Sequence, residues 1–460
     1  MLRCPHPAMM YYFPLKAVGA LGLLVSSASA YSYGFPYGTE MVRGVSIGGW
    51  LNLEAWVTPS LFTNSGDIRI IDEWTFGQYQ DPAKALQTLQ NHWDTFITEQ
   101  DFADIAAAGL NHVRLPIGYW IFDVAEGEPY VQGQLPYLYK AVEWSKNHHL
   151  KLFITIYGAP GSQNGFINSG HYVRTPAWTL NQTNIDRTTA IIQRLATMFE
   201  HQKDVVTIIN PLNQPAGFLG DGVMNPTKKA FPHWKLRYPQ VCEPALLPDT
   251  CFQPASNIRA ANNTASRGHQ HQRRNETTAM IITDGFLPLT YWDGFLTTPE
   301  YEGVFMSTYG YQVWTDNDIK LNQSAHISAA CAKTTTLLTS PLPILVGEWG
   351  APNTDCAQYM NGRTSGSRYA GTYPPGTSVY MGSCTGLTGN ATTFSDDYKI
   401  FLRQFFETQV RAYEKAANAV GWFYWNWKME NADEWSYQAG MKYGWIPKYP
   451  ADFKYPDLCI

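Results

Sequence analysis

Residues 138–156 read LYKAVEWSKNHHLKLFITI, an amphipathic helical pattern over 138–147 that is followed directly by an apolar strand at 151–156. The same succession of helix and strand recurs along the chain. Strands that alternate with helices usually form a parallel sheet, because each parallel connection needs a crossover. This stretch therefore predicts an α/β fold made of repeated strand and helix units.

Eight segments have the composition of short buried strands. They are residues 43–47, 112–115, 151–156, 205–209, 279–283, 304–307, 344–346 and 422–424. Helices are expected at 86–107, 138–147, 185–199 and 396–417. Eight strands in this arrangement predict a (β/α)8 TIM barrel, a single domain with loop insertions, whose active site lies at the carboxyl ends of the strands.

Residues 221–275 break this pattern, because Pro, Asn, His and Arg are common there and no convincing apolar period is present. We expect an irregular insertion, either a loop held by Cys242 and Cys251 or a gene-model error. His269 and His271 suggest metal binding at first sight, but a solvated polar loop is the simpler interpretation. We therefore expect no metal site.

The first 30 residues have the features of a signal peptide. Arg3 and Lys16 supply positive charge, residues 17–25 form a short apolar run, and Ala28-Ser29-Ala30 is a small-residue cleavage site. The apolar run is too short to span a bilayer. We expect a secreted protein of the extracellular space or cell wall, with residues 31–460 as its barrel domain.

Cysteine and asparagine patterns agree with secretion. Removal of Cys4 with the signal peptide leaves an even set of cysteines, which predicts disulfides. Sequons for N-glycosylation predict a glycoprotein, and they stand at Asn181, Asn262, Asn275, Asn322 and Asn390.

Composition narrows the class of partner. Charged residues make up 15% of the chain, the net charge is -5, and no basic stripe is present, which argues against nucleic acid. Aromatic residues reach 14%, which fits either a large core or a surface that stacks on sugars. We expect a monomer with no membrane partner and no cofactor.

Glu348 is the strongest candidate for chemistry. It follows the apolar run 344–346 and Gly347, at the end of the seventh expected strand. Arg114 ends the second strand and would keep this carboxylate ionised. A purely structural Arg–Glu pair is the alternative. The other strand-end residues that should converge on the same mouth are Asn213, Gln214, Tyr309, Tyr311 and Trp425.

A retaining glycosidase needs two carboxylates roughly 5–5.5 Å apart, one as nucleophile and one as acid/base. The end of the fourth strand is where the second carboxylate should stand. Gln214 occupies that position.

Five segments carry a resemblance to a known family. They are residues 43–50 (RGVSIGGW), 109–120 (GLNHVRLPIGYW), 158–166 (GAPGSQNGF), 346–349 (VGEW) and 427–438 (WKMENADEWSYQ). Through them the chain resembles the fungal exo-β-1,3-glucanases of glycoside hydrolase family 5. The resemblance runs from about residue 40 to the C-terminus, outside 221–275.

The resemblance implies a role for each matching residue. Glu348 matches the nucleophile, Arg114 its support, and Asn213 the residue that hydrogen-bonds the sugar 2-hydroxyl. Glu54 matches a carboxylate that grips the terminal glucose. Phe166 and Trp314 match an aromatic clamp at the entrance. The remaining matches are Tyr311 and Trp425 at the cleavage subsite, Asn168 and Asn431 as sugar contacts, and the disulfides Cys331–Cys459 and Cys356–Cys384.

Three positions depart from the family pattern. Gln214 replaces the acid/base glutamate, Tyr157 replaces a histidine before Gly-Ala-Pro-Gly, and Tyr309 begins Tyr-Gly-Tyr-Gln where the family has His-His-Tyr-Gln. We therefore expect a β-1,3-glucan-type glycoside hydrolase with strongly impaired hydrolysis, unless Asp221 or Asp284 supplies the missing acid. The alternative is a pseudoenzyme that binds glucan without cleaving it.

Overall fold

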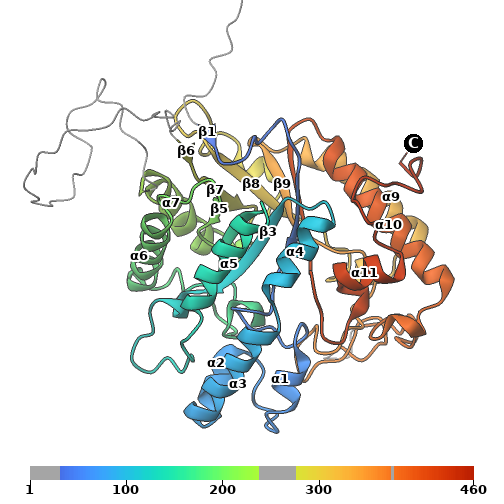
Figure 1. Ribbon diagram of the computed structural model, residues 1–460, viewed down its shortest axis with the longest axis horizontal. Coiled ribbons are helices and arrows are strands. Elements are labelled where there is room, and N and C mark those ends of the chain that lie inside the picture. Colours follow the sequence, from blue (N-terminus) through green and yellow to red (C-terminus); the bar gives the residue numbers. More distant parts are fainter. Residues whose placement is uncertain (1–31, 238–275, 374–377, 460) are drawn as a thin grey trace, which may run out of the picture. The chain divides into compact units, whose positions relative to one another are not determined.

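The strands close into a barrel, as the sequence predicts (Figure 1). The computed structural model describes residues 32–237, 276–373 and 378–459, within one compact unit, Tyr31–Ile460. All eight barrel strands are parallel, in the closed order β10-β2-β3-β4-β5-β7-β8-β9. They are β2 (Val42–Ser46), β3 (His112–Gly118), β4 (Lys151–Gly158), β5 (Val206–Asn210), β7 (Ala279–Thr283), β8 (Val304–Tyr309), β9 (Ile344–Trp349) and β10 (Ala419–Tyr424).

Helices lie around the outside of the barrel and in the loops. The long ones are α3 (Pro82–Thr95), α4 (Glu99–Ala107), α5 (Leu135–Asn147), α6 (Gln182–Met198), α7 (Asp221–Arg237), α9 (Gln323–Leu337) and α10 (Asp396–Lys415). The short ones are α1 (Pro59–Thr63), α2 (Glu73–Gln78), α8 (Asp316–Ile319) and α11 (Tyr437–Tyr443). Single 3-10 turns are η1 (Tyr119–Ile121), η2 (Ile167–Ser169), η3 (Gly217–Leu219), η4 (Leu289–Trp292), η5 (Ala391–Thr393) and η6 (Asp433–Trp435). A separate two-residue pair joins β1 (Ser32–Tyr33) to β6 (Glu276–Thr277).

The interior of the barrel is filled by apolar side chains from strands around its whole circumference. Because alternate residues of a strand face opposite sides, one set points inward while its neighbours pack against the helices. Arg114 is paired in register with Phe153, and its guanidinium lies 5.4 Å from the Phe153 ring centroid. The inward set thus places Arg114 directly above the apolar filling, which includes Val42, Phe153, Ile208, Ile281, Phe305, Leu345 and Phe423.

Two helical regions differ from the sequence-based expectation. The expected helix at 86–107 is two helices, because Thr98 and Asp101 form a capping box that starts α4. Residues 221–237 form α7 instead of irregular structure, although Pro226 and Pro232 lie inside it. Tertiary packing stabilises α7, since the Trp234 indole is buried and donates to Thr189 of α6 at 2.9 Å. Helix α7 provides the crossover between β5 and β7.

Several predictions concern residues outside the described ranges. These are the signal peptide and its Cys4, the pair Cys242 and Cys251, the histidines His269 and His271, and the sequons at Asn262 and Asn275. In the described ranges, no helix combines the length and the apolar character that crossing a membrane requires.

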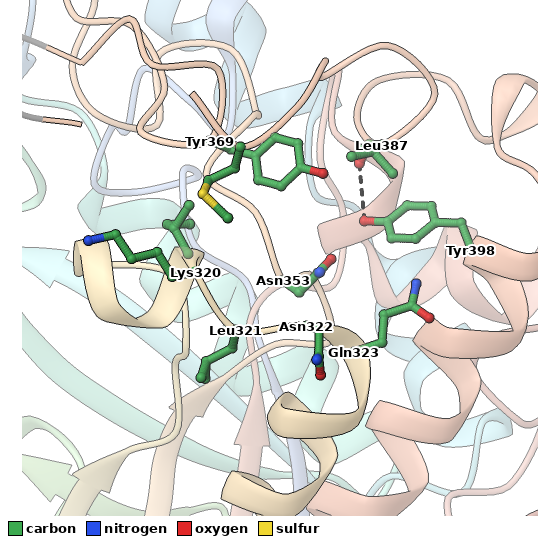
Figure 2. A pocket seen from close by; sticks show the side chains of 10 residues that line it. Lys320, Leu321, Asn322, Gln323, Asn353, Tyr369, Leu387 and Tyr398 are labelled. Atoms are coloured by element: carbon green, nitrogen blue, oxygen red, sulfur yellow. Dashed lines mark hydrogen bonds between the residues drawn. The ribbon is translucent and has the colours of Figure 1, made fainter. Parts of the chain in front are cut away.

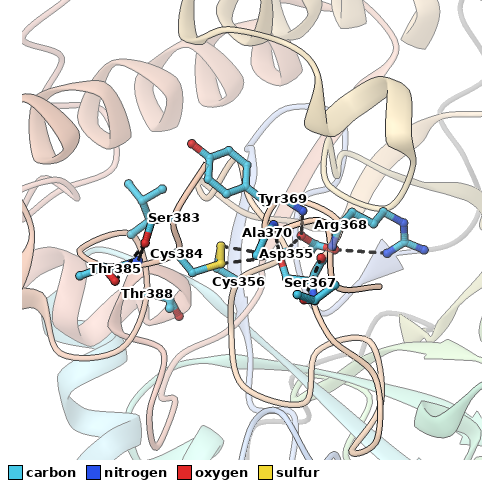
Figure 3. Close-up of a disulfide and its surroundings, with 12 residues drawn as sticks. Asp355, Cys356, Ser367, Arg368, Tyr369, Ala370, Ser383, Cys384, Thr385 and Thr388 are labelled. Carbon is cyan, nitrogen blue, oxygen red and sulfur yellow. Dashed lines mark hydrogen bonds and ion pairs between the residues drawn. A yellow bond between two sulfur atoms is a disulfide. The ribbon is translucent and has the colours of Figure 1, made fainter. Parts of the chain in front are cut away.

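Both disulfides implied by the family resemblance are present. Cys331–Cys459 joins α9 to the C-terminal segment, and Cys356–Cys384 closes the loop after β9 (Figure 3). The carboxylate of Asp355 organises that loop, because it accepts hydrogen bonds from Ser367 Oγ and from the backbone amides of Arg368 and Tyr369. The disulfide and the buried carboxylate therefore hold the same loop.

We expect the longer disulfide loop to contribute more stability. The sequence separations are 128 for Cys331–Cys459 and 28 for Cys356–Cys384. On the chain-entropy model these loops contribute about 5 and about 3–4 kcal/mol, respectively. Denaturant unfolding of two double Cys→Ser variants tests the order, and a larger loss for the Cys356–Cys384 pair would contradict it.

A buried carboxyl group also predicts how stability changes with pH. Burial raises the pKa of Glu434 from 4.5 to about 8, and Glu54 and Glu73 shift in the same direction for the same reason. Because the folded state holds these protons more tightly, their contribution is full below 4.5 and is lost as pH rises through about 8. Thermal unfolding midpoints should fall across that window by at least ~2 °C per carboxyl.

Glu434→Gln provides the control for this pH dependence. Thr388 Oγ donates to one Glu434 oxygen at 2.6 Å and the Gly389 amide to the other at 3.2 Å. A glutamine can keep both contacts, because the threonine hydroxyl can also accept. The decline with pH should be shallower in this variant, and an unchanged slope would show that Glu434 is not one of the groups responsible.

Candidate active site

The carboxylate of Glu348, in β9, is held by three donors. Arg114 Nη2 and the Tyr157 hydroxyl both lie 2.8 Å from its Oε1, and the Tyr311 hydroxyl donates to Oε2 at 3.0 Å. Only 3% of the Glu348 side chain and 1% of Arg114 are exposed, so the ion pair is nearly dry. Burial raises the pKa values of both tyrosines well above the ordinary value, so their hydroxyls keep their protons and donate.

Arg114 links Glu348 to the end of β5. Its Nη2 also donates to Asn213 Oδ1 at 3.0 Å, and the Tyr309 hydroxyl donates to the same oxygen at 3.1 Å. Burial alone would lower the pKa of Arg114, but the charge of Glu348 together with the contributions of Tyr157 and Tyr309 outweighs this, and the net shift is upward. Asn213 Nδ2 is buried without a hydrogen-bond partner in the described part of the chain, which leaves its amide nitrogen available to donate to a ligand. Arg114, in β3, therefore links Glu348 in β9 to Asn213 in the loop after β5.

Gln214 follows Asn213 and is also nearly buried, with 7% exposed. Its backbone adopts a positive φ of 50°, which is uncommon for a residue with a side chain. Asn168 Nδ2 donates to Gln214 Oε1 at 2.9 Å, and the Asn168 carbonyl in turn accepts from Asn52. The structure thus brings Asn168 and Gln214 together on the side of the mouth formed by β5 and η2.

Glu54 lies in the loop after β2 and is 4% exposed. Its Oε2 accepts from the Trp56 indole at 3.0 Å, while Oε1 has no hydrogen-bond partner among the described residues. Burial raises the pKa of Glu54 to about 8, and the nearby charge of Glu348 adds to the increase. Glu54 therefore presents a buried, unsatisfied oxygen of the kind that a ligand hydroxyl can pair with.

Large aromatic rings surround this polar group. Tyr157 stacks on Trp425 with ring centroids 5.8 Å apart and an interplanar angle of 4°. Trp56 stacks on Trp425 at 6.2 Å, so the three rings form one series. Tyr311 meets Trp314 edge-on at 6.0 Å, and Trp314 is 38% exposed. Trp56, Tyr157 and Trp425 are buried, whereas Trp314 presents an exposed flat ring of the kind that can stack on a pyranose.

A second aromatic group, exposed to solvent, begins at Tyr309. Phe286 stacks on Tyr309 at 5.4 Å, and Phe166, Phe218 and Phe286 contact one another with centroids 5.9 to 6.1 Å apart. We call Phe166, Phe218 and Phe286 the phenylalanine shelf. The structure places Phe166 in this shelf, whereas Trp314 packs on Tyr311. The residues expected to form a clamp thus belong to two different groups of rings.

Asp284 and Asp221 are the two carboxylates that the sequence offered as replacements for the acid. Asp284 accepts from the Thr308 hydroxyl at 2.6 Å and from the Phe286 amide at 2.9 Å. Asp221 is exposed at the start of α7. Neither makes a hydrogen bond to Gln214. Asn431, expected to be a sugar contact, is exposed and donates to Gln358 at 3.1 Å.

A separate pocket of about 300 Å³ lies between α8, the start of α9 and the loop after β9 (Figure 2). Its lining includes Asn322, Tyr369 and Tyr398, and the Tyr398 hydroxyl donates to the Leu387 carbonyl at 3.1 Å. No carboxylate lines this pocket. It therefore lacks the groups that cleave a glycosidic bond.

Some residues that shape the site were not predicted. Gln163 is buried and donates to the carbonyls of Tyr157 and Asn213 at 2.6 and 2.8 Å, so it joins the ends of β4 and β5. It lies within segment 158–166, which resembles the family, so the sequence could have indicated it as a site residue. Phe218 and Phe286 had no such signal, because single aromatic residues in loops form no pattern.

Comparisons with known proteins agree with this architecture. Of the solved structures, the rutinosidase from Aspergillus niger has a TM-score of 0.65 at 16% identity and covers 90% of this chain and 99% of its own. A family 5 xyloglucanase from Paenibacillus pabuli has a TM-score of 0.51 at 12% identity, covering 88% of this chain and 95% of its own. At such identities the likeness concerns the fold alone.

The sequence relatives share a much higher identity with this chain than these solved structures do. A probable glucan 1,3-beta-glucosidase A of Aspergillus niger is 37% identical over 457 residues, which cover 96% of this chain and 98% of the relative. A glucan 1,3-beta-glucosidase of Blumeria graminis is 37% identical over 430 residues, covering 92% and 91%. No protein-family model matches the sequence. On these relatives, the chain belongs to glycoside hydrolase family 5, among the glucan 1,3-beta-glucosidases.

Proposed function

We propose that this protein recognises β-1,3-linked glucan at the mouth of its barrel and hydrolyses it with strongly impaired efficiency. The observation that carries the proposal is that the site combines one carboxylate, Glu348, which Arg114 holds, with an amide at position 214. The curated relatives are named for action on 1,3-β-glucan, and this supports the choice of substrate.

The nucleophile half of the mechanism is complete. Glu348 is a carboxylate at a strand end, with Arg114 as its counter-charge and Tyr311 as a donor to its second oxygen. Asn213 Nδ2 and Glu54 Oε1 are buried, have no partners within the described ranges, and would bind sugar hydroxyls. A sugar in this position would place its anomeric carbon against Glu348, with Tyr157, Trp425 and Trp56 as the surrounding rings.

The acid half is incomplete. Gln214 can donate a hydrogen bond to a glycosidic oxygen but has no proton to transfer. General acid–base help contributes about 10²–10⁴ in rate, or roughly 3–5 kcal/mol of barrier. A sugar hydroxyl is a poor leaving group and depends on that proton. Asp284 accepts hydrogen bonds from Thr308 and the Phe286 amide and makes none to Gln214, which argues against it as a substitute for the acid.

Pure glucan binding is the second candidate function. It is favoured because three donors hold the Glu348 carboxylate, and Tyr157, one of them, stands where the family has histidine. A carboxylate stabilised in this way is a weaker nucleophile than a freer one. The same Asn213, Glu54 and aromatic rings serve binding as well as cleavage.

Secretion and glycosylation belong to this proposal. The described sequon asparagines, Asn181, Asn322 and Asn390, are all exposed. Each uses its side-chain oxygen to cap the start of a helix, which leaves the amide nitrogen available for a glycan. We propose that the chain works outside the cell or in the cell wall, as a monomer.

Restoring the acid tests the proposal. Gln214→Glu should raise turnover of laminarin by about 10²–10⁴, because it returns general acid–base catalysis to a site whose nucleophile is in place. Reducing-sugar release measures this. Wild-type turnover close to that of Gln214→Glu would contradict the proposed impairment.

Two controls accompany this experiment. Gln90→Glu makes the same chemical change on the exposed face of α3 and should leave turnover unchanged. Isothermal titration with laminari-oligosaccharides measures binding independently of cleavage. Saturable binding without sugar release, even in Gln214→Glu, would favour the binding function, and absence of binding would contradict both.

A further inference from the structure

The Gln214 amide has one end fixed and one end free. Asn168 donates to its oxygen at 2.9 Å, whereas its nitrogen has no acceptor among the described residues. The nitrogen is therefore the end that is available to donate to a ligand. It can donate a hydrogen bond to a departing oxygen, which stabilises negative charge there, but no proton moves.

This restriction selects among leaving groups. A departing alkoxide resembles hydroxide, whose conjugate acid has a pKa of about 15.7, and it needs a proton. A phenol has a pKa of about 10, and electron-withdrawing substituents lower it further. A phenolate of that kind can depart as an anion with only a hydrogen bond from Gln214. The chemistry of position 214 thus disfavours sugar leaving groups and unsubstituted phenols and tolerates electron-poor phenols.

The phenylalanine shelf provides a surface for such an aromatic group. Phe218 is in η3, four residues after Gln214, and Phe286 stacks on Tyr309, whose hydroxyl donates to Asn213. Phe166, Phe218 and Phe286 are 38%, 54% and 40% exposed. Exposed phenylalanine rings in contact with one another favour offset stacking with a flat aromatic ligand. The shelf begins beside the position from which a leaving group departs.

We propose that this site cleaves β-glucosides whose leaving group is an electron-poor phenol. The inference rests on the proposed function, because it uses the same nucleophile and the same substituted acid position. One oxygen of Glu348 attacks the anomeric carbon, and the bond from that carbon to the phenolic oxygen breaks with its electron pair. Oε2 is the attacking atom, since it accepts one hydrogen bond whereas Oε1 accepts two.

The second step, in which glucose is released from Glu348, needs a nucleophile other than water. Water must lose a proton as it attacks, and a neutral amide at 214 cannot take that proton. The glucosyl ester on Glu348 therefore accumulates. A small anion such as azide needs no base: it bonds to the anomeric carbon, the ester bond to Glu348 breaks, and the carboxylate is regenerated.

The test uses the purified full-length secreted protein with dinitrophenyl β-glucoside, phenyl β-glucoside and laminaribiose. We expect a rapid stoichiometric burst of dinitrophenolate followed by slow turnover, and little release from the other two substrates. Azide should accelerate the slow phase by about 10²-fold or more, the lower end of the missing base catalysis, and yield glucosyl azide. Mass spectrometry of the burst phase should find a glucose adduct on Glu348.

Two variants make the outcome decisive. Gln214→Glu should lose the azide acceleration and cleave laminaribiose, and Glu348→Gln should abolish the burst while its thermal unfolding remains cooperative. Absence of a burst from a wild-type protein that binds laminari-oligosaccharides, together with laminarin cleavage by Gln214→Glu, would overturn this inference and leave the proposed function intact. Equal wild-type turnover of laminaribiose and dinitrophenyl glucoside would overturn both.

Discussion

The ion pair between Arg114 and Glu348 is the interaction on which the mouth of this barrel depends. Both side chains are almost fully buried, and their atoms are 2.8 Å apart. Removing one partner of a buried pair typically costs about 3–5 kcal/mol, because the other charge stays buried without compensation. Replacing both by apolar residues is often neutral, so such a pair is rarely kept for stability alone. Its retention at the strand ends therefore points to chemistry or binding.

Gln214 stands outside the direct contacts of that pair. Arg114 reaches Asn213 and Glu348, whereas Gln214 is held by Asn168 from η2. An uncharged amide at 214 needs no counter-charge, so it adds nothing to the charge balance around Glu348. On the proposed function, this separation explains how the chain can hold the buried Glu348 carboxylate and its tyrosine donors without a proton donor at 214.

Much of this architecture could be predicted from the sequence. The buried strands are short apolar runs, and their regular spacing gave the closed barrel and the positions of Arg114, Asn213 and Glu348 at its mouth. The two disulfides followed from family resemblance, because the spacing of six cysteines does not define their pairing. Helix α7 was missed because two prolines hide its pattern, and its packing through Trp234 is visible only in three dimensions.

The aromatic surroundings were the least predictable part of the site. Phe166 packs with Phe218 and Phe286, and Trp314 packs on Tyr311, and the sequence indicated neither set of partners. Strand periodicity fixes which side chains point into a barrel, but a loop side chain is placed by the path of its loop. Arg114 and Glu348 lie on strands, whereas Asn213 and Gln214 follow β5, and Phe218 and Phe286 also lie outside the strands, so strand register alone places only the first two. The barrel therefore fixes Arg114 and Glu348, while the side chains around them depend on the paths of the loops.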